Sequence, residues 1–347
     1  MKYKKKCILI IVVFACIGSS VCGQATDAKK PLPHFTRNQV LLFGGIPYVS
    51  FFGALGSLAL VSEQYVEPVL HSTLFLATIP HIILDPIEGG FNTALSGIAL
   101  AGGLGLNQLP GLYGDASVNH LLTNISMKYT MWSYYQGYAK ARSMAEAGEY
   151  EQNLEVLSFA DVFKSCYDPT VLLQPPVYVP LLVETALITG FSFLGDRSSA
   201  VWNTGESYIG SSKVPILTGL IAVGAVSFLS NTFTGIGEEA LFRGVGYEEM
   251  KISFGLLPAK IVDAVLFSSV HIPQEIMNEA HAGEIATMFA YRSLTTLGLQ
   301  WAYDKGGLRS SAALHTWING ISSIIGFLCT SGTENEQQLS LNFTFNL

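Results

Sequence analysis

Long apolar runs without charge are the feature of this sequence that most restricts its fold. The run QVLLFGGIPYVSFFGALGSLALVS, residues 39–62, holds no charged side chain, and about 20 such residues can cross a bilayer as a helix. Backbone groups in lipid must pair within the protein, so spanning segments are helices or closed barrels. Charged residues make up 13% of the chain, about half the share usual in soluble domains. The continuous runs predict an all-α fold, a polytopic transmembrane helical bundle.

The apolar runs fall into two groups. N-terminal membrane segments are expected over residues 37–106, where the short runs at 68–84 and 91–106 form either two tilted helices or a re-entrant pair around Asp85-Pro86. The second group predicts a membrane core over residues 171–330. Its runs lie at 171–194, 214–233, 254–271, 285–303 and 308–329.

The remaining segments are more polar. Residues 107–170 favour helix and are rich in tyrosine and charge, so we expect a polar helical insert that lies in water or at the membrane interface. Residues 331–347 form a polar tail, whose last part, LSLNFTFNL, alternates like a strand. Residues 1–24 begin with lysines, continue with an apolar run and end with small residues. This layout predicts a signal peptide, with an uncleaved first membrane anchor as the alternative.

Charge and cysteine content narrow the possible partners. The net charge of −7 disfavours nucleic acid, because a phosphate backbone attracts a basic surface. Three of the five cysteines lie in the leader, and the other two, Cys166 and Cys329, form neither a disulfide framework nor a metal cluster. We expect membrane lipid and an unidentified peptide or protein substrate as partners. Because the leader is of a bacterial kind, the predicted location is a bacterial inner membrane, with several spans.

A first polar cluster, GEEALFRG, follows an apolar run directly. Glu239 and Arg243 are four residues apart and share one helical face, so they can pair. On a helix, Glu238 points about 100° away from Glu239 and is free for a separate role. A glutamate–arginine pair can also be a purely structural clasp.

Two more clusters follow in the next apolar segments. FSSVH ends at His271, and HTWIN places His315 and Asn319 on one helical face. A lone histidine in a membrane helix is often a packing contact, but ionisable groups inside a membrane are costly. Three clusters in successive segments therefore favour a functional site.

These residue types suit the hydrolysis of a peptide or amide bond without a nucleophilic side chain. A glutamate can act as general base for water, and a histidine can orient that water. A second histidine and an asparagine amide are donors suited to an oxyanion. Glutamate and histidine are also zinc ligands, so a metal-bound water is an alternative.

The three motifs together resemble those of the CAAX-protease and bacteriocin-processing family of intramembrane glutamic endopeptidases. EEALFR matches the EExxxR motif, FSSVH the FxxxH motif and HTWIN the HxxxN motif, in the family's order. The resemblance covers residues 171–330. It implies that Glu238 activates water, that His271 helps to hold this water, and that Glu239 with Arg243 is a supporting pair. The residues that it implies for the oxyanion are His315 and Asn319.

The resemblance also favours a reaction without a cofactor. Catalytic zinc has three protein ligands, each oriented by a partner. Here Glu238, His271 and His315 would come from three different helices, and the sequence shows no second carboxylate near His315 to orient its ring. Zinc remains the alternative to this expectation.

Two other classes of function are open to the sequence. A rhomboid-type serine protease would have to use Ser96 with His315, but Ala94 stands where a glycine is expected and Glu238 would have no role. A transporter or non-catalytic scaffold could use the same residues to relay protons or hold helices together, and a broken helix pair at 68–106 would suit a transporter. A zinc protease of the HExxH type is excluded, because the motif is absent.

Overall fold

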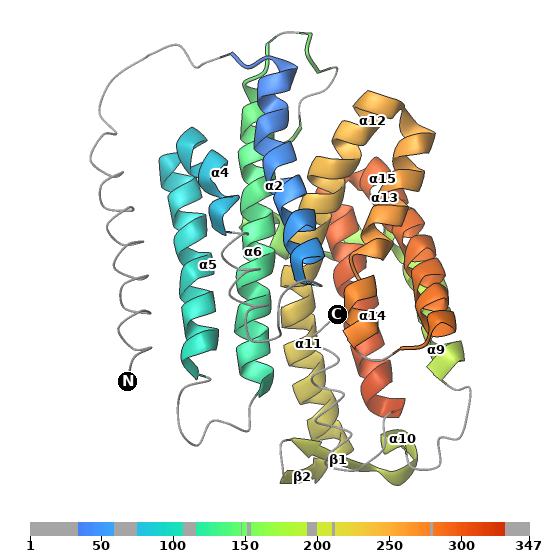
Figure 1. The fold of residues 1–347 in the computed structure, drawn as a ribbon. Coiled ribbons are helices and arrows are strands. Elements are labelled where there is room, and N and C mark those ends of the chain that lie inside the picture. Colours follow the sequence, from blue (N-terminus) through green and yellow to red (C-terminus); the bar gives the residue numbers. More distant parts are fainter. Residues whose placement is uncertain are drawn as a thin grey trace.

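The structure is a computed structural model that describes residues 34–58, 75–106, 116–146, 148–150, 154–192, 200–209, 212–277 and 280–329. Long helices lie side by side in a bundle, which confirms the predicted all-α fold (Figure 1). The predicted signal peptide at residues 1–24 and the tail at 331–347 lie outside the described residues. Both therefore stay predictions.

The helices and strands follow one another in an order that can be traced in Figure 1. They are α2 (Arg37–Leu58), α4 (Ile79–Leu84), α5 (Pro86–Leu106), α6 (Ala116–Ser143), α7 (Phe159–Ser165), α8 (Pro169–Leu172), α9 (Pro175–Ser192), α10 (Val201–Thr204), β1 (Glu206–Ile209), β2 (Ser212–Pro215), α11 (Ile216–Glu239), η2 (Ala240–Tyr247), α12 (Glu248–Phe254), α13 (Leu256–Ser269), α14 (Ile272–Met277) and α15 (Ala282–Cys329).

The helix break expected at Asp85-Pro86 is present. Helix α4 ends before Asp85 and α5 begins at Pro86, and Oδ1 of Asp85 accepts a hydrogen bond from the N–H of Glu88 at 3.0 Å. A carboxylate in this place satisfies one of the free N–H groups at a helix start, and proline is suited to the first helical position because it lacks an N–H. Two separate helices, α4 and α5, therefore pack against each other and against α6.

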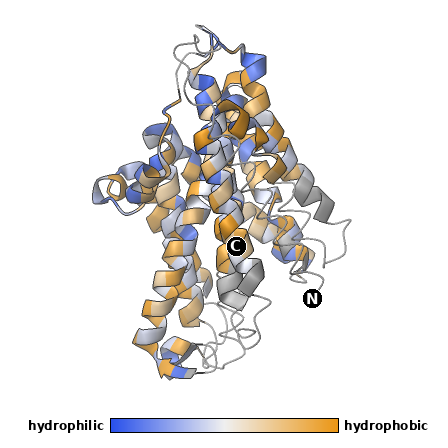
Figure 2. Ribbon diagram, turned by 90° about the vertical axis from the view of Figure 1, so that its left-hand side faces the viewer, coloured by the Kyte–Doolittle hydropathy of each residue, from blue (hydrophilic) through white to orange (hydrophobic). Residues whose placement is uncertain are grey.

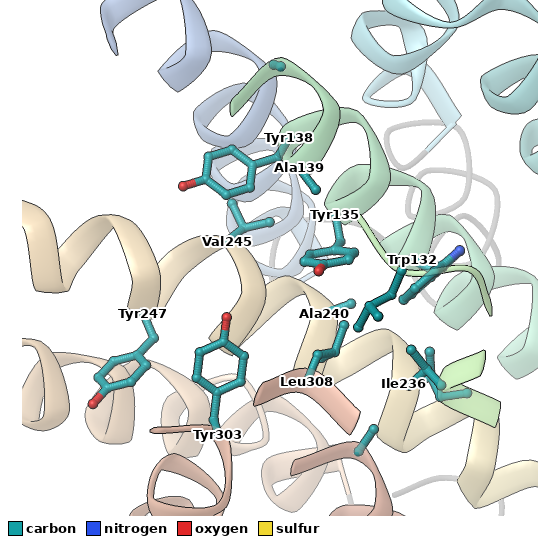
Figure 3. Packing of buried hydrophobic residues seen from close by; sticks show 14 of the residues in the cluster. Trp132, Tyr135, Tyr138, Ala139, Ile236, Ala240, Val245, Tyr247, Tyr303 and Leu308 are labelled. Carbon is teal, nitrogen blue, oxygen red and sulfur yellow. The ribbon is translucent and has the colours of Figure 1, made fainter. Parts of the chain in front are cut away.

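Helix α6 lies in the core of the bundle, so the prediction that it is exposed to water or to the interface is wrong. Met131, Trp132, Tyr134, Tyr135 and Tyr138 are each 1% exposed or less. The helix packs against α5, α11 and η2, and Figure 3 shows its aromatic rings facing the side chains of η2 and α15. The boundaries of the predicted insert, 107–170, stay untested.

The polar groups of α6 tolerate this burial because they are paired. The amide of Gln136 donates to the carbonyl of Leu157, and Nη1 of Arg142 lies 3.3 Å from Oε2 of Glu248. Tyrosine buries an apolar ring while its hydroxyl finds a polar partner. A helix of polar composition can therefore be buried when residues of other segments pair with its polar groups.

Helix α11 continues directly into the π-helical segment η2, which carries Arg243. Two glycines of η2 admit aromatic rings from other helices. A Cβ on Gly244 would lie 2.5 Å from the ring of Tyr135, and a Cβ on Gly246 would lie 2.6 Å from the ring of Tyr48. Segments of π-helix are frequent at functional sites, because they redirect side chains from the ordinary helical faces.

The runs predicted at 285–303 and 308–329 both lie in α15 and are separated by Gly307. The backbone of Gly307 has a φ of 66° inside this long helix, in the left-handed region that glycine enters most easily. A short antiparallel hairpin, β1 with β2, precedes α11 and pairs Ser207 with Val214. The apolar pattern did not indicate this hairpin.

Among the described residues, two helical stretches are long and apolar enough to cross a membrane, Ile216–Phe254 and Ala282–Cys329. Large apolar side chains are also exposed on other helices, among them Ile98 on α5 and Leu182 on α9. Figure 2 shows hydrophobic residues predominating along the long helices, with hydrophilic residues more frequent near their ends. These features agree with an all-α membrane protein.

Candidate active site

Glu239 lies at the centre of a buried polar cluster. It is the last residue of α11 and is 0% exposed. Its Oε1 accepts a hydrogen bond from Nη1 of Arg243 at 3.1 Å and lies 2.8 Å from Nδ1 of His315. An ionised carboxylate can only accept hydrogen bonds, so Nδ1 of His315 is the donor in this contact. The pair predicted from the sequence is present, and His315 joins it from α15.

Arg243 connects this pair to α13. Its Nε lies 3.5 Å from Oδ2 of Asp263, and its guanidinium carbon lies 4.3 Å from the centre of the Phe267 ring, an attractive contact between a cation and an aromatic face. Asp263 also accepts a hydrogen bond from Nε2 of Gln300 at 2.8 Å. One arginine thus lies between two fully buried carboxylates.

Glu238 has a different set of partners. Its Oε1 forms an ion pair with Nζ of Lys128 on α6, and its Oε2 lies 3.7 Å from Nε2 of His315. The ring of His315 therefore lies between two adjacent glutamates, with one nitrogen toward each. The side chains of Glu238, Lys128 and His315 are each 6% exposed.

The other two predicted residues are placed less directly. His271 follows α13, with its ring edge-on to Phe267 at 5.3 Å between ring centres, and it interacts electrostatically with Glu238 and His315. Asn319 lies one helical turn after His315 on α15. Within the described residues, no contact joins its side chain to the cluster, and its carbonyl accepts from Oγ of Ser323 at 2.8 Å.

The serine-protease alternative requires Ser96 to pair with His315, and within the described residues no hydrogen bond joins them. Ser96 is buried on α5, and its hydroxyl has no hydrogen-bond partner among the described residues. The ring of His315 is instead engaged by Glu239 through Nδ1 and faces Glu238 through Nε2. This geometry favours the glutamates as the chemically relevant partners of His315.

The expectation that no carboxylate orients His315 is wrong, because Glu239 does so from 76 positions earlier in the chain. Sequence spacing cannot show such a contact. For zinc, the fit is poor. The ammonium of Lys128 is paired with Glu238 and would repel a divalent cation there. Over the described residues, no group of three His, Cys, Asp or Glu side chains could hold a metal ion. That the protein works without a cofactor stays a prediction.

Lys128 is a residue of the cluster that the sequence analysis missed. It is the single charge in NISMKYTMWSYYQGY, residues 124–138. A lone charge within an aromatic helix requires a partner when that helix is buried. An exposed helix would not require such a partner, so the predicted exposure of this segment gave no indication of the pair.

Gly237 allows α6 and α11 to touch beside the cluster. A Cβ on Gly237 would lie 2.8 Å from Cα and Cβ of Lys128, so Gly237→Ala is expected to lower the free energy of unfolding by about 1–3 kcal/mol through overpacking. Gly45→Ala in α2 is the matched control, because its added Cβ meets no atom within 4 Å. Thermal unfolding in detergent compares the two, and equal midpoints would contradict the close approach.

The fold and this cluster define a class of protein: an all-α membrane protein with paired acids, an arginine and histidines buried between its helices. Residues 221–321 match the family model described as Type II CAAX prenyl endopeptidase Rce1-like. This match confirms the resemblance to the CAAX protease family that the motifs indicated. The matched residues include Glu238 and Asn319 but not Lys128 or the rest of α6. No curated protein and no solved structure matches the chain.

Proposed function

We propose that this protein is an intramembrane endopeptidase in which Glu238 activates the water that hydrolyses a peptide bond. The observation that carries the proposal is the position of His315 between Glu238 and Glu239, with Nδ1 at 2.8 Å from one carboxylate and Nε2 at 3.7 Å from the other. A base next to an oriented histidine is the arrangement that proton transfer requires.

In the proposed reaction, each residue of the cluster has a separate role. Glu238 takes a proton from water as the oxygen bonds to the peptide carbonyl carbon, and this proton then passes to the amine as the C–N bond breaks. His315 is held by Glu239, and Arg243 balances the charge of Glu239. His271 interacts electrostatically with Glu238 and would hold the water.

The oxyanion is assigned to His315 and Asn319 by family resemblance. For His315 the geometry supports a role next to Glu238. For Asn319 the support is its position one turn further along α15 and its partial burial. We further propose that the protein crosses a bacterial inner membrane several times and cleaves a peptide presented at the membrane.

Peptide turnover by the purified protein tests this function, and we expect it to survive thorough removal of metals. The protein is reconstituted in liposomes with a peptide library, and cleavage is followed by mass spectrometry with and without a chelator. The physical reason is the ammonium of Lys128 at Glu238, which opposes a bound cation. Activity lost on chelation and restored by zinc would contradict the metal-free mechanism. Ion-coupled uptake without any cleavage would favour a transporter.

A further inference from the structure

Glu238 depends on a residue from outside the domain that matches the protease family. Its Oε1 is paired with Nζ of Lys128 on α6, 110 positions earlier in the chain. Residues 221–321 match the family model and do not include this lysine. Lysine is almost never fully buried unless it is paired, and Lys128 is 5% exposed. Its position beside the proposed base therefore requires an explanation.

The other cation of the cluster is already engaged. The guanidinium of Arg243 donates to Glu239 at 3.1 Å and lies 3.5 Å from Asp263, so it balances carboxylates other than Glu238. Without Lys128, Glu238 would be a buried carboxylate next to another carboxylate, with no arginine or lysine paired to it among the described residues. An ionised group in that position is strongly unfavourable.

Among the described residues, three elements other than α11 place a titratable group near Glu238. They are α6 with Lys128, α15 with His315, and the turn after α13 with His271. Of these groups, Lys128 forms the ion pair with Oε1 of Glu238, whereas His315 lies 3.7 Å from Oε2. Lys128 is therefore the cation that pairs directly with Glu238.

The contact between α6 and α11 fixes the position of this lysine. Gly237 lets the backbone of α11 approach the backbone and Cβ of Lys128. One turn earlier on α6, Nδ2 of Asn124 donates to Oγ of Ser230 and to Oγ1 of Thr234, both at 3.2 Å. The two helices are thus joined beside Lys128 and one turn before it, which directs its ammonium to Glu238.

We propose that Lys128 is a positioning residue of the hydrolytic site, which keeps Glu238 ionised and occupies its Oε1 so that Oε2 receives the proton from water. The distances agree with this division, because Oε1 is paired with the ammonium while Oε2 faces His315 at 3.7 Å. This inference rests on the proposed role of Glu238 as the base. It extends the site beyond the matched domain to α6.

A purely structural ion pair makes a different prediction. If Lys128 only stabilised the fold, its loss would lower activity equally at every pH. If Lys128 keeps Glu238 ionised, its loss lowers turnover mainly at low pH. Turnover then recovers as the pH rises, because alkaline conditions deprotonate Glu238 without the lysine. The pH profile therefore separates the two roles.

The test compares Lys128→Met with the wild-type protein in detergent. Infrared spectra across pH follow the C=O stretch of protonated carboxyl groups, and a band lost in Lys128→Met/Glu238→Gln belongs to Glu238. Turnover of library peptides is measured over the same range. The matched control is Lys140→Met, because Lys140 also lies on α6 and pairs with Asp85, about three turns from Lys128.

In Lys128→Met, we expect the Glu238 band and the acid limb of turnover to move to higher pH by about one to three units. Lys128→Arg should keep the wild-type profile, as should Lys140→Met. If Lys128→Met fails to fold, Lys128→Gln removes the charge while keeping a donor. An unchanged band, or an equal loss of turnover at every pH, overturns the inference but leaves Glu238 as the base. Full turnover by Glu238→Gln would instead overturn the proposed function, and this inference with it.

Discussion

Glu238→Gln is expected to lower peptide turnover by about 10²–10⁴-fold, the usual contribution of a general base. The structure adds a second effect, because the substitution leaves the ammonium of Lys128 buried without its partner. Breaking one side of a buried ion pair lowers the free energy of unfolding by about 3–5 kcal/mol. Turnover and thermal unfolding of the same preparation measure the two effects.

The double variant Lys128→Met/Glu238→Gln separates these effects. Replacing both members of a buried ion pair by neutral groups is often neutral for stability, so the double variant should unfold near the wild-type midpoint while remaining inactive. A double variant that regains turnover along with stability would show that Glu238 acts through the fold alone.

Arg243→Met is expected to lower the free energy of unfolding by about 3–5 kcal/mol or to prevent folding. Its loss leaves Glu239 and Asp263 without the cation that lies between them, and all three side chains are 0% exposed. Unfolding by heat or denaturant in detergent measures the change.

Arg309→Met is the matched control for that substitution. Arg309 pairs with Glu155 at 3.0 Å, and the two side chains are 42% and 66% exposed. Exposed pairs of this kind contribute about 0–1 kcal/mol, so this variant should unfold close to the wild-type midpoint. If the two arginine variants were equally stable, the account of a charge-balanced core around Arg243 would be wrong.

Much of the fold follows from local pattern. Long apolar runs predicted helices, and the segments near 214–233, 254–271 and 308–329 are helical in the structure. Asp85 is a helix-capping residue and Pro86 is suited to a helix start, so the helix break between them could be predicted from the local sequence. The pair Glu239–Arg243 was predictable for the same reason, since a spacing of four fixes a shared helical face.

The environment of α6 could not be read in this way. Its charge and tyrosine content are those of an exposed helix. Burial of α6 is favourable only because residues from distant segments pair with its polar groups. Lys128 meets Glu238 across 110 positions and Arg142 meets Glu248 across 106. Such contacts depend on tertiary packing, and neither segment shows a sequence pattern that predicts them.

The same limit applied to His315. The sequence grouped it with Asn319, four residues on, whereas its nearest polar partner is Glu239 on another helix. The apolar pattern also did not predict the π-helical segment after Glu239, in which Gly244 and Gly246 lie against the rings of Tyr135 and Tyr48. Motif spacing predicted the candidate residues of the site, and tertiary packing determines which of them pair.

The central claim is that the cluster around Glu238 hydrolyses peptide bonds with water. Purified wild-type protein in liposomes is incubated with the peptide library in water labelled with heavy oxygen, and new fragments are weighed by mass spectrometry. The account predicts fragments whose new carboxylate carries one labelled oxygen, made by the wild-type protein and absent with Lys128→Met/Glu238→Gln. Equal yields of labelled fragments from both proteins, or no cleavage by the wild-type protein, would contradict it.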